Sequence, residues 1–139
     1  LLEGQRSNVK LNKQRMLSKL EHWRKVIVAS CEQCGQINLP TLHDPAQLAP
    51  MLAQLSETAN HLIFFDPQAN PAPTQLAPQD RVIFIGPEGG FSPEELRAFA
   101  DAKAEGYRLG TLTLRAETMP AAALTLIHQA TGWPTNTDD

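Results

Sequence analysis

The sequence predicts an α/β domain with a mainly parallel sheet that helices cover on both faces. Two short apolar runs, residues 61–65 and 82–85, are typical of buried strands. Helical patterns lie before, between and after these runs, and strands that alternate with helices favour parallel pairing. At 139 residues the chain is most simply one domain at 1–139, with an N-terminal segment at 1–9 and a frayed tail at 133–139.

Two helices are predicted before the first strand. The first runs from residue 11 to about residue 34 and ends at Gly35, because apolar residues recur there at three-and-four spacing. A short extended segment is expected at 36–41. The second helix is expected to use Asp44 as its N-cap and Pro45 in its first turn. The apolar face of the first helix consists of Leu17, Leu20, Trp23, Ile27 and Cys31. That of the second helix consists of Leu48, Met51, Leu52 and Leu55.

The strand at 61–65 is expected to end at Asp66-Pro67. Residues 66–80 contain four prolines and are predicted to form a loop without regular structure. Loops of that length in a compact domain are usually functional or mobile. The second strand, 82–85, is followed by a glycine-rich loop at 86–90, where glycine permits positive φ or close approach of the backbone to a ligand.

The third helix, 92–104, has clear start signals. Ser92 suits the N-cap, Pro93 the first helical position and Glu95 the third, where a capping box closes. Gly106 is expected to end the helix before a short strand at 107–109. The last helix is predicted at 117–131, with Pro120 in its first turn.

Charge and cysteine content narrow the function classes. The net charge is −3, but residues 1–25 contain seven Lys and Arg against two Glu; this basic stretch suits either a phosphate-backbone contact or a solvated helix face. No apolar run approaches the roughly 20 residues that a membrane span needs. Cys31 and Cys34 lack further zinc ligands at suitable spacing, so we expect no metal and free cysteines, as in a cytoplasmic protein.

Two motifs carry a family resemblance. Residues 85–92, Ile-Gly-Pro-Glu-Gly-Gly-Phe-Ser, are followed by Leu109-Gly110, Leu114-Arg115 and Glu117-Thr118. Together they resemble the bacterial 16S ribosomal RNA uridine-N3 methyltransferases of the SPOUT superfamily. Residues 8–11 and 23–35 are similar to the same family, so the resemblance covers about residues 6–130.

The resemblance implies a C-terminal trefoil knot, S-adenosylmethionine as cofactor, and a homodimer that acts on 16S ribosomal RNA of the small ribosomal subunit. Family members also carry an N-terminal RNA-binding barrel that resembles the PUA fold. No such stretch lies in these 139 residues, which suggests a catalytic-domain fragment.

The resemblance also implies the site. Arg115 is the candidate cation for an RNA phosphate or a uracil oxygen, and Glu117 either orients Arg115 or caps the last helix. Arg6 is a second candidate RNA contact. The general base is not assigned. The expected cofactor-binding residues are Phe64, Phe65, Ile85, Gly86, Pro87, Glu88, Gly89, Leu109, Gly110, Leu112, Leu114 and Arg115.

The chain departs from the family pattern at two positions, because Thr111 replaces a proline and Leu112 replaces an arginine. The change at Leu112 and the missing barrel domain favour a second hypothesis, a knotted RNA-binding or assembly module that no longer transfers methyl groups, whereas the intact cofactor loops oppose it. A third hypothesis is an α/β enzyme that binds nucleotide phosphate. It ranks last because the chain lacks both G-x-x-x-x-G-K-[ST] and G-x-G-x-x-G.

Overall fold

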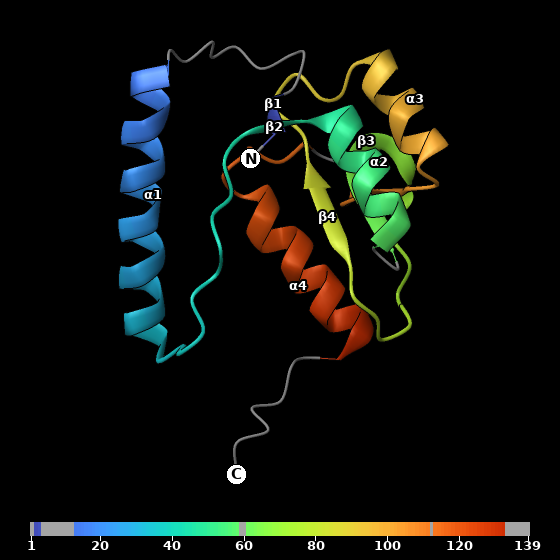
Figure 1. Ribbon diagram of the computed structural model, residues 1–139. Coiled ribbons are helices and arrows are strands. Elements are labelled where there is room, and N and C mark those ends of the chain that lie inside the picture. Colours follow the sequence, from blue (N-terminus) through green and yellow to red (C-terminus); the bar gives the residue numbers. More distant parts are fainter. Residues whose placement is uncertain (1, 4–12, 59–60, 112, 133–139) are drawn as a thin grey trace.

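The computed structural model describes residues 2–3, 13–58, 61–111 and 113–132 (Figure 1). Two predicted site residues, Arg6 and Leu112, lie outside the described residues, as does the predicted tail. The described elements, in chain order, are β1 (Leu2–Glu3), α1 (Lys13–Cys34), β2 (Ala46–Gln47), α2 (Leu48–Thr58), β3 (Leu62–Pro71), β4 (Val82–Ile85), α3 (Pro93–Asp101), β5 (Glu105–Arg108) and α4 (Met119–Thr131).

The predicted parallel sheet is confirmed. Its three strands lie in the order β4-β3-β5, and both pairings are parallel. Phe65, on the central strand, pairs with Ile85, the last residue of β4, and with Tyr107, the residue before the end of β5, so β4 and β5 end at the same edge. Helices α2 and α3 lie on one side of this sheet and α4 on the other (Figure 1).

Each face of the sheet has its own apolar core. Successive strand residues point to opposite faces, so Leu62 and Phe84 pack with α2 and α3, whereas Ile63 and Phe65 pack with α4. Phe99 of α3 and Ile63 are fully buried. The resulting α/β sandwich holds the carboxyl ends of the strands rigidly, and this edge of the sheet is where ligands bind in open α/β folds.

The cap of α3 forms as predicted. The backbone N–H of Glu95 donates to Oγ of Ser92 at 3.1 Å, and the backbone N–H of Ser92 donates to Oε2 of Glu95 at 2.7 Å. Both side chains are buried, although the acidic one belongs to a residue type that is rarely buried. The capping box therefore fixes where the loop after β4 becomes a helix.

Helix α1 also ends where predicted. Gly35 has φ 73° and the N–H of Gln36 donates to the carbonyl of Cys31, a Schellman closure that favours glycine. The predicted apolar face is correct at Leu20 and Cys31, which are buried, but Leu17 is 58% exposed. Residues 36–41 form no strand, and Ile37 within them is 86% exposed.

Three predicted boundaries are wrong. Helix α2 starts at Leu48 rather than after Asp44, because Ala46–Gln47 pair with Leu2–Glu3. The strand β3 continues past Asp66-Pro67 to Pro71, because its end pairs again with β5. Helix α4 starts at Met119 rather than at Glu117, and Thr118 is its N-cap.

The end of α3 was also predicted wrongly. The helix ends at Asp101, and Lys103, not Gly106, adopts the left-handed conformation with φ 56°. The N–H of Ala104 donates to the carbonyl of Phe99, and the N–H of Lys103 to that of Ala100, so a Schellman motif closes on a lysine. Gly106 lies inside β5 instead. Glycine suits this position because a Cβ there would lie 2.5 Å from Cζ of Phe64.

Candidate functional site

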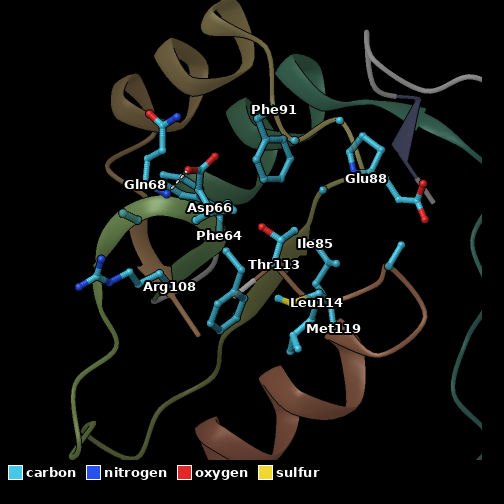
Figure 2. A pocket seen from close by; sticks show the side chains of 18 of the residues that line it. Phe64, Asp66, Gln68, Ile85, Glu88, Phe91, Arg108, Thr113, Leu114 and Met119 are labelled. Carbon is cyan, nitrogen blue, oxygen red and sulfur yellow. Dashed lines mark hydrogen bonds between the residues drawn. The ribbon is translucent and has the colours of Figure 1, made fainter. Parts of the chain in front are cut away.

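A cavity of about 590 Å³ opens at the carboxyl ends of the three parallel strands (Figure 2). Three segments form its walls: the irregular part of β3, the loop between β4 and α3, and the chain from the end of β5 to the start of α4. Its lining residues are Phe64–Ala69, Ile85–Phe91, Pro93, Leu96, Arg108, Leu109, Thr113, Leu114, Ala116 and Met119.

An irregularity in β3 forms the first wall. Phe65 and Asn70 both pair with Tyr107 of β5, so residues 66–69 bulge out of the strand between them. All four of these residues line the cavity. The bulge therefore turns a central strand into a wall of the site without ending its pairing with β5.

The glycine-rich loop forms the second wall. The N–H of Gly90 donates to the carbonyl of Pro87 at 2.8 Å, and Gly90 has φ 66°, which closes a tight turn. Phe91 anchors the loop, since it is 6% exposed and its ring meets that of Phe99 edge to face with centroids 4.9 Å apart. A Cβ on Gly86 would lie 3.2 Å from the Phe91 ring, so glycine lets the loop pack closely there.

The third wall joins the cavity to α4. Leu109, Met119 and Ile85 are half-buried and pack on the core beneath α4, while Leu114 is half-buried in the segment between them. The N–H groups of Thr118 and Met119 both donate to the carbonyl of Arg115, which sets the turn into the helix. This wall is apolar wherever its side chains line the cavity, apart from Arg108 and Thr113.

Arg115 and Glu117, the two predicted catalytic residues, lie close together outside the cavity. Nη1 of Arg115 is 3.9 Å from Oε1 of Glu117, and the two side chains are 83% and 70% exposed. At this distance the two charges form no hydrogen bond, so the orienting role of Glu117 stays a prediction. Their neighbours Leu114 and Ala116 line the cavity, so the ion pair lies beside it and faces solvent.

Nine of the predicted cofactor-binding residues line the cavity. They are Phe64, Phe65, Ile85, Gly86, Pro87, Glu88, Gly89, Leu109 and Leu114. Gly110 and Arg115 do not line it, and Gly110 has φ 68° in the chain that leaves β5. The residues that sequence reasoning missed include residues 66–69, Phe91, Arg108, Thr113 and Met119. The proline-rich stretch after the first strand was the available signal for residues 66–69, since it indicated a functional loop.

The start of α3 has no vacancy for a phosphate. The capping box engages the N–H groups of Ser92 and Glu95, Pro93 has no N–H, and Glu94 and Glu95 place acidic side chains in the first turn. Acidic side chains at a helix N-terminus take the place that a bound anion would use. The loop before α3 therefore suits a ligand without a phosphate group.

Away from the cavity, His61, Glu105 and Tyr107 form a polar network. Nε2 of His61 lies 3.1 Å from Oε2 of Glu105, and the hydroxyl of Tyr107 donates to the same carboxylate. The hydrogen bond from Tyr107 lowers the pKa of Glu105. Burial, and then the contact with Glu105, raise the pKa of Tyr107 to about 12. This network links His61, the residue before β3, to β5, so we infer that it stabilises the sheet.

The C-x-x-C pair forms no disulfide. Cys31 is buried and Cys34 exposed, and both are free. Within the described ranges, no group of three or more His, Cys, Asp or Glu residues is placed to hold a metal ion. In the same part of the chain, no helix is both long and apolar enough to cross a membrane.

Comparison with known proteins agrees with this geometry. The RNA methyltransferase domain family matches residues 1–128. A ribosomal RNA small subunit methyltransferase E from Buchnera aphidicola is 31% identical over 109 residues, which cover 77% of this chain and 44% of the relative. A protein of the same description from Mycobacterium bovis is 30% identical over 128 residues, covering 86% of this chain and 48% of the relative.

A solved structure shares the fold. A putative methyltransferase from Legionella pneumophila, determined with its cofactor SAM bound, superposes with a TM-score of 0.82 at 31% identity. The match covers 94% of this chain and 54% of that protein. The chain spans about half the length of the curated relatives it matches.

Proposed function

Since the chain belongs to the RNA methyltransferase domain family, we propose that it transfers a methyl group from S-adenosylmethionine to N3 of a uridine in 16S ribosomal RNA. The observation that carries this proposal is the cavity at the carboxyl ends of the strands, which the two motif segments and the β3 bulge enclose. The relatives described as ribosomal RNA methyltransferases and the SAM-bound Legionella structure support it.

The cavity suits a nucleoside cofactor. Its volume of about 590 Å³ falls in the range of small-molecule sites, and most of its lining side chains are apolar. Ile85, Leu109 and Leu114 would contact the flat faces of an adenine, and the loop at 86–90 would supply backbone N–H and C=O groups. When bound, the cofactor supplies an electrophilic methyl group on a sulfonium ion. The cofactor carries no phosphate group.

The RNA would approach from the side of Arg115 and Glu117. Arg115 carries its positive charge into solvent directly beside the cavity, where it would contact an RNA phosphate or a uracil oxygen and favour the uridine anion. Glu117, 3.9 Å from that guanidinium, would help to orient it. Positioning of the uracil against the cofactor would supply much of the rate, and Arg6 would be an additional RNA contact.

The finer features of the family complete the proposal. We propose that residues 1–139 form a SPOUT methyltransferase domain, that its C-terminal part forms a trefoil knot, and that the domain works as a homodimer. The partner is the small ribosomal subunit, and the compartment is the cytoplasm. Exposed apolar side chains on α1, among them Leu17 and Val26, are consistent with a subunit contact.

Calorimetric titration with S-adenosylhomocysteine, with ATP as the control ligand, tests the cofactor assignment. We expect the homocysteine compound to bind and ATP not to bind, because α3 offers no phosphate site. Binding of ATP alone would refute the methyltransferase proposal. Binding of 16S ribosomal RNA without any binding of the homocysteine compound would instead favour the non-catalytic module.

A substitution at Arg115 tests the RNA side. Arg115→Gln should lower methylation of a 16S ribosomal RNA fragment about tenfold or more, since removing one charged contact costs roughly 1.5–3 kcal/mol. The affinity for S-adenosylhomocysteine should stay within twofold. Arg97→Gln, an exposed change on α3 outside the cavity lining, is the matched control. Equal methylation by both variants would remove Arg115 from the proposed site.

A further inference from the structure

We propose that Asp66 is the residue that holds the ribose hydroxyls of the nucleoside in this cavity. The inference rests on the proposed function, because it takes the ligand to be an adenosyl compound. Asp66 follows the central strand residue Phe65 and lies in the bulge that forms the first wall. The sequence alone predicts Asp66 only as part of a turn that ends a strand.

Position distinguishes Asp66 from the other charged side chains of the cavity. In Figure 2 the carboxylate of Glu88 and the guanidinium of Arg108 point outward at opposite margins of the view, whereas Asp66 lies between them. Asp66 is half-buried, while Glu88 is exposed. Of the two carboxylates in the cavity lining, that of Asp66 is the less exposed, so we take it as the anionic group for a ligand in the cavity.

A hydrogen bond orients the carboxylate of Asp66. The backbone N–H of Gln68 donates to its Oδ1 at 2.8 Å, across the bulge (Figure 2). No cation among the described residues forms an ion pair with it. One oxygen is thus held in place by the protein, and the lone pairs of Oδ2 remain for donors that enter the cavity.

The chemistry of a carboxylate selects the part of the ligand. A phosphate would be repelled, and a sulfonium has no hydrogen to donate. The α-ammonium and adenine amino groups are N–H donors, but only the ribose offers two neighbouring O–H donors to one carboxylate. An acidic side chain that accepts from ribose hydroxyls beyond the end of a parallel strand is a general solution in nucleotide-binding α/β folds.

Three ligands and three variants test the role of Asp66 by calorimetry. The ligands are S-adenosylhomocysteine, its 2′-deoxy analogue and S-adenosylmethionine. The variants are Asp66→Asn, which keeps the shape and an acceptor for the Gln68 N–H, Asp66→Ala, and Asp80→Asn as the matched control. Asp80 is exposed in the segment before β4 and lies outside the cavity lining. Far-ultraviolet circular dichroism confirms that each variant is folded.

The unsubstituted chain should bind S-adenosylhomocysteine about 10–100-fold more tightly than the 2′-deoxy analogue, the range for hydrogen bonds to a charged group. Asp66→Ala should abolish this preference, and Asp66→Asn should remove most of it. Asp80→Asn should keep it. The losses should be equal for S-adenosylmethionine and S-adenosylhomocysteine, because both carry the same ribose.

Two results would overturn the assignment of Asp66 alone. One is an unchanged preference for the ribose compound in Asp66→Ala. The other is a larger loss for S-adenosylmethionine than for S-adenosylhomocysteine, which would place the carboxylate against the sulfonium. If the unsubstituted chain binds neither adenosyl compound, the proposed function itself fails, and the inference fails with it.

Discussion

Replacement of Gly106 by alanine should disturb the core and the cavity together. A Cβ built on Gly106 lies 2.5 Å from Cζ of Phe64, closer than real Cβ atoms approach, and 3.0 Å from both Cε atoms. The Phe64 ring cannot move freely, because it stacks on Phe99 with centroids 4.5 Å apart and an interplanar angle of 11°. The edge of Phe91 confines it further, at 6.0 Å between centroids.

We expect Gly106→Ala to lower the free energy of unfolding by about 2 kcal/mol, within the usual cost of an overpacked core. Urea denaturation followed by circular dichroism measures this change. Because Phe64 also lines the cavity, the affinity for S-adenosylhomocysteine should fall in the same variant. The affinity is measured without denaturant, at a temperature at which the variant remains folded.

A double-mutant cycle isolates the contact between Gly106 and Phe64. Phe64→Leu alone should cost about 1 kcal/mol, through loss of the aromatic pairs. In the Phe64→Leu background, Gly106→Ala should cost at least about 1 kcal/mol less than in the unsubstituted chain, because a smaller side chain leaves room for the methyl group. Additive costs, or a Gly106→Ala variant as stable as the parent, would refute the reasoning.

Three further predictions concern stability. Lys103→Gly should raise the free energy of unfolding by about 0.5–1 kcal/mol, since Lys103 closes α3 with φ 56°; Lys25→Gly, within α1, should lower it by a similar amount. Ser92→Ala should cost about 1 kcal/mol by loss of the capping box, and a cost below half of this would contradict the cap geometry. Because the pKa of Tyr107 is raised to about 12, its neutral phenol adds stability that is complete below pH 10 and is lost as the pH rises through 12. Tyr107 is the one tyrosine of the chain, so phenolate absorbance reports its titration directly, and Tyr107→Phe should remove this alkaline dependence.

Local patterns predicted the elements that local interactions stabilise. Three features depend only on residues that are close in the sequence. They are the strand at 82–85, the capping box of Ser92 and Glu95, and the end of α1 at Gly35. The family motifs added the glycine-rich loop and the segment around Leu114 as parts of one cavity. The predicted lining agrees with the structure at residues 85–89, Leu109 and Leu114, whereas Gly110 and Arg115 do not line the cavity.

Contacts between distant residues decided what the local patterns got wrong. Asp44 is a good N-cap, yet α2 begins later because residues 46–47 pair with residues 2–3. Gly106 is a good helix stop, yet it serves β5 because the Phe64 ring fills the space of a side chain. In both places a tertiary contact outweighed a propensity of about 1 kcal/mol.

The sequence by itself determined the α/β class and the capped start of α3, because strand and helix patterns and capping are properties of neighbouring residues. That two loops meet in one site came from the family motifs. Only the tertiary structure decided that β3 pairs with β5 on both sides of Asp66, which turns residues 66–69 into a wall of the cavity. Strand register between residues 65 and 107 depends on how the whole sheet packs between its helices. The placement of Asp66 therefore follows from the fold and not from its neighbours in the chain.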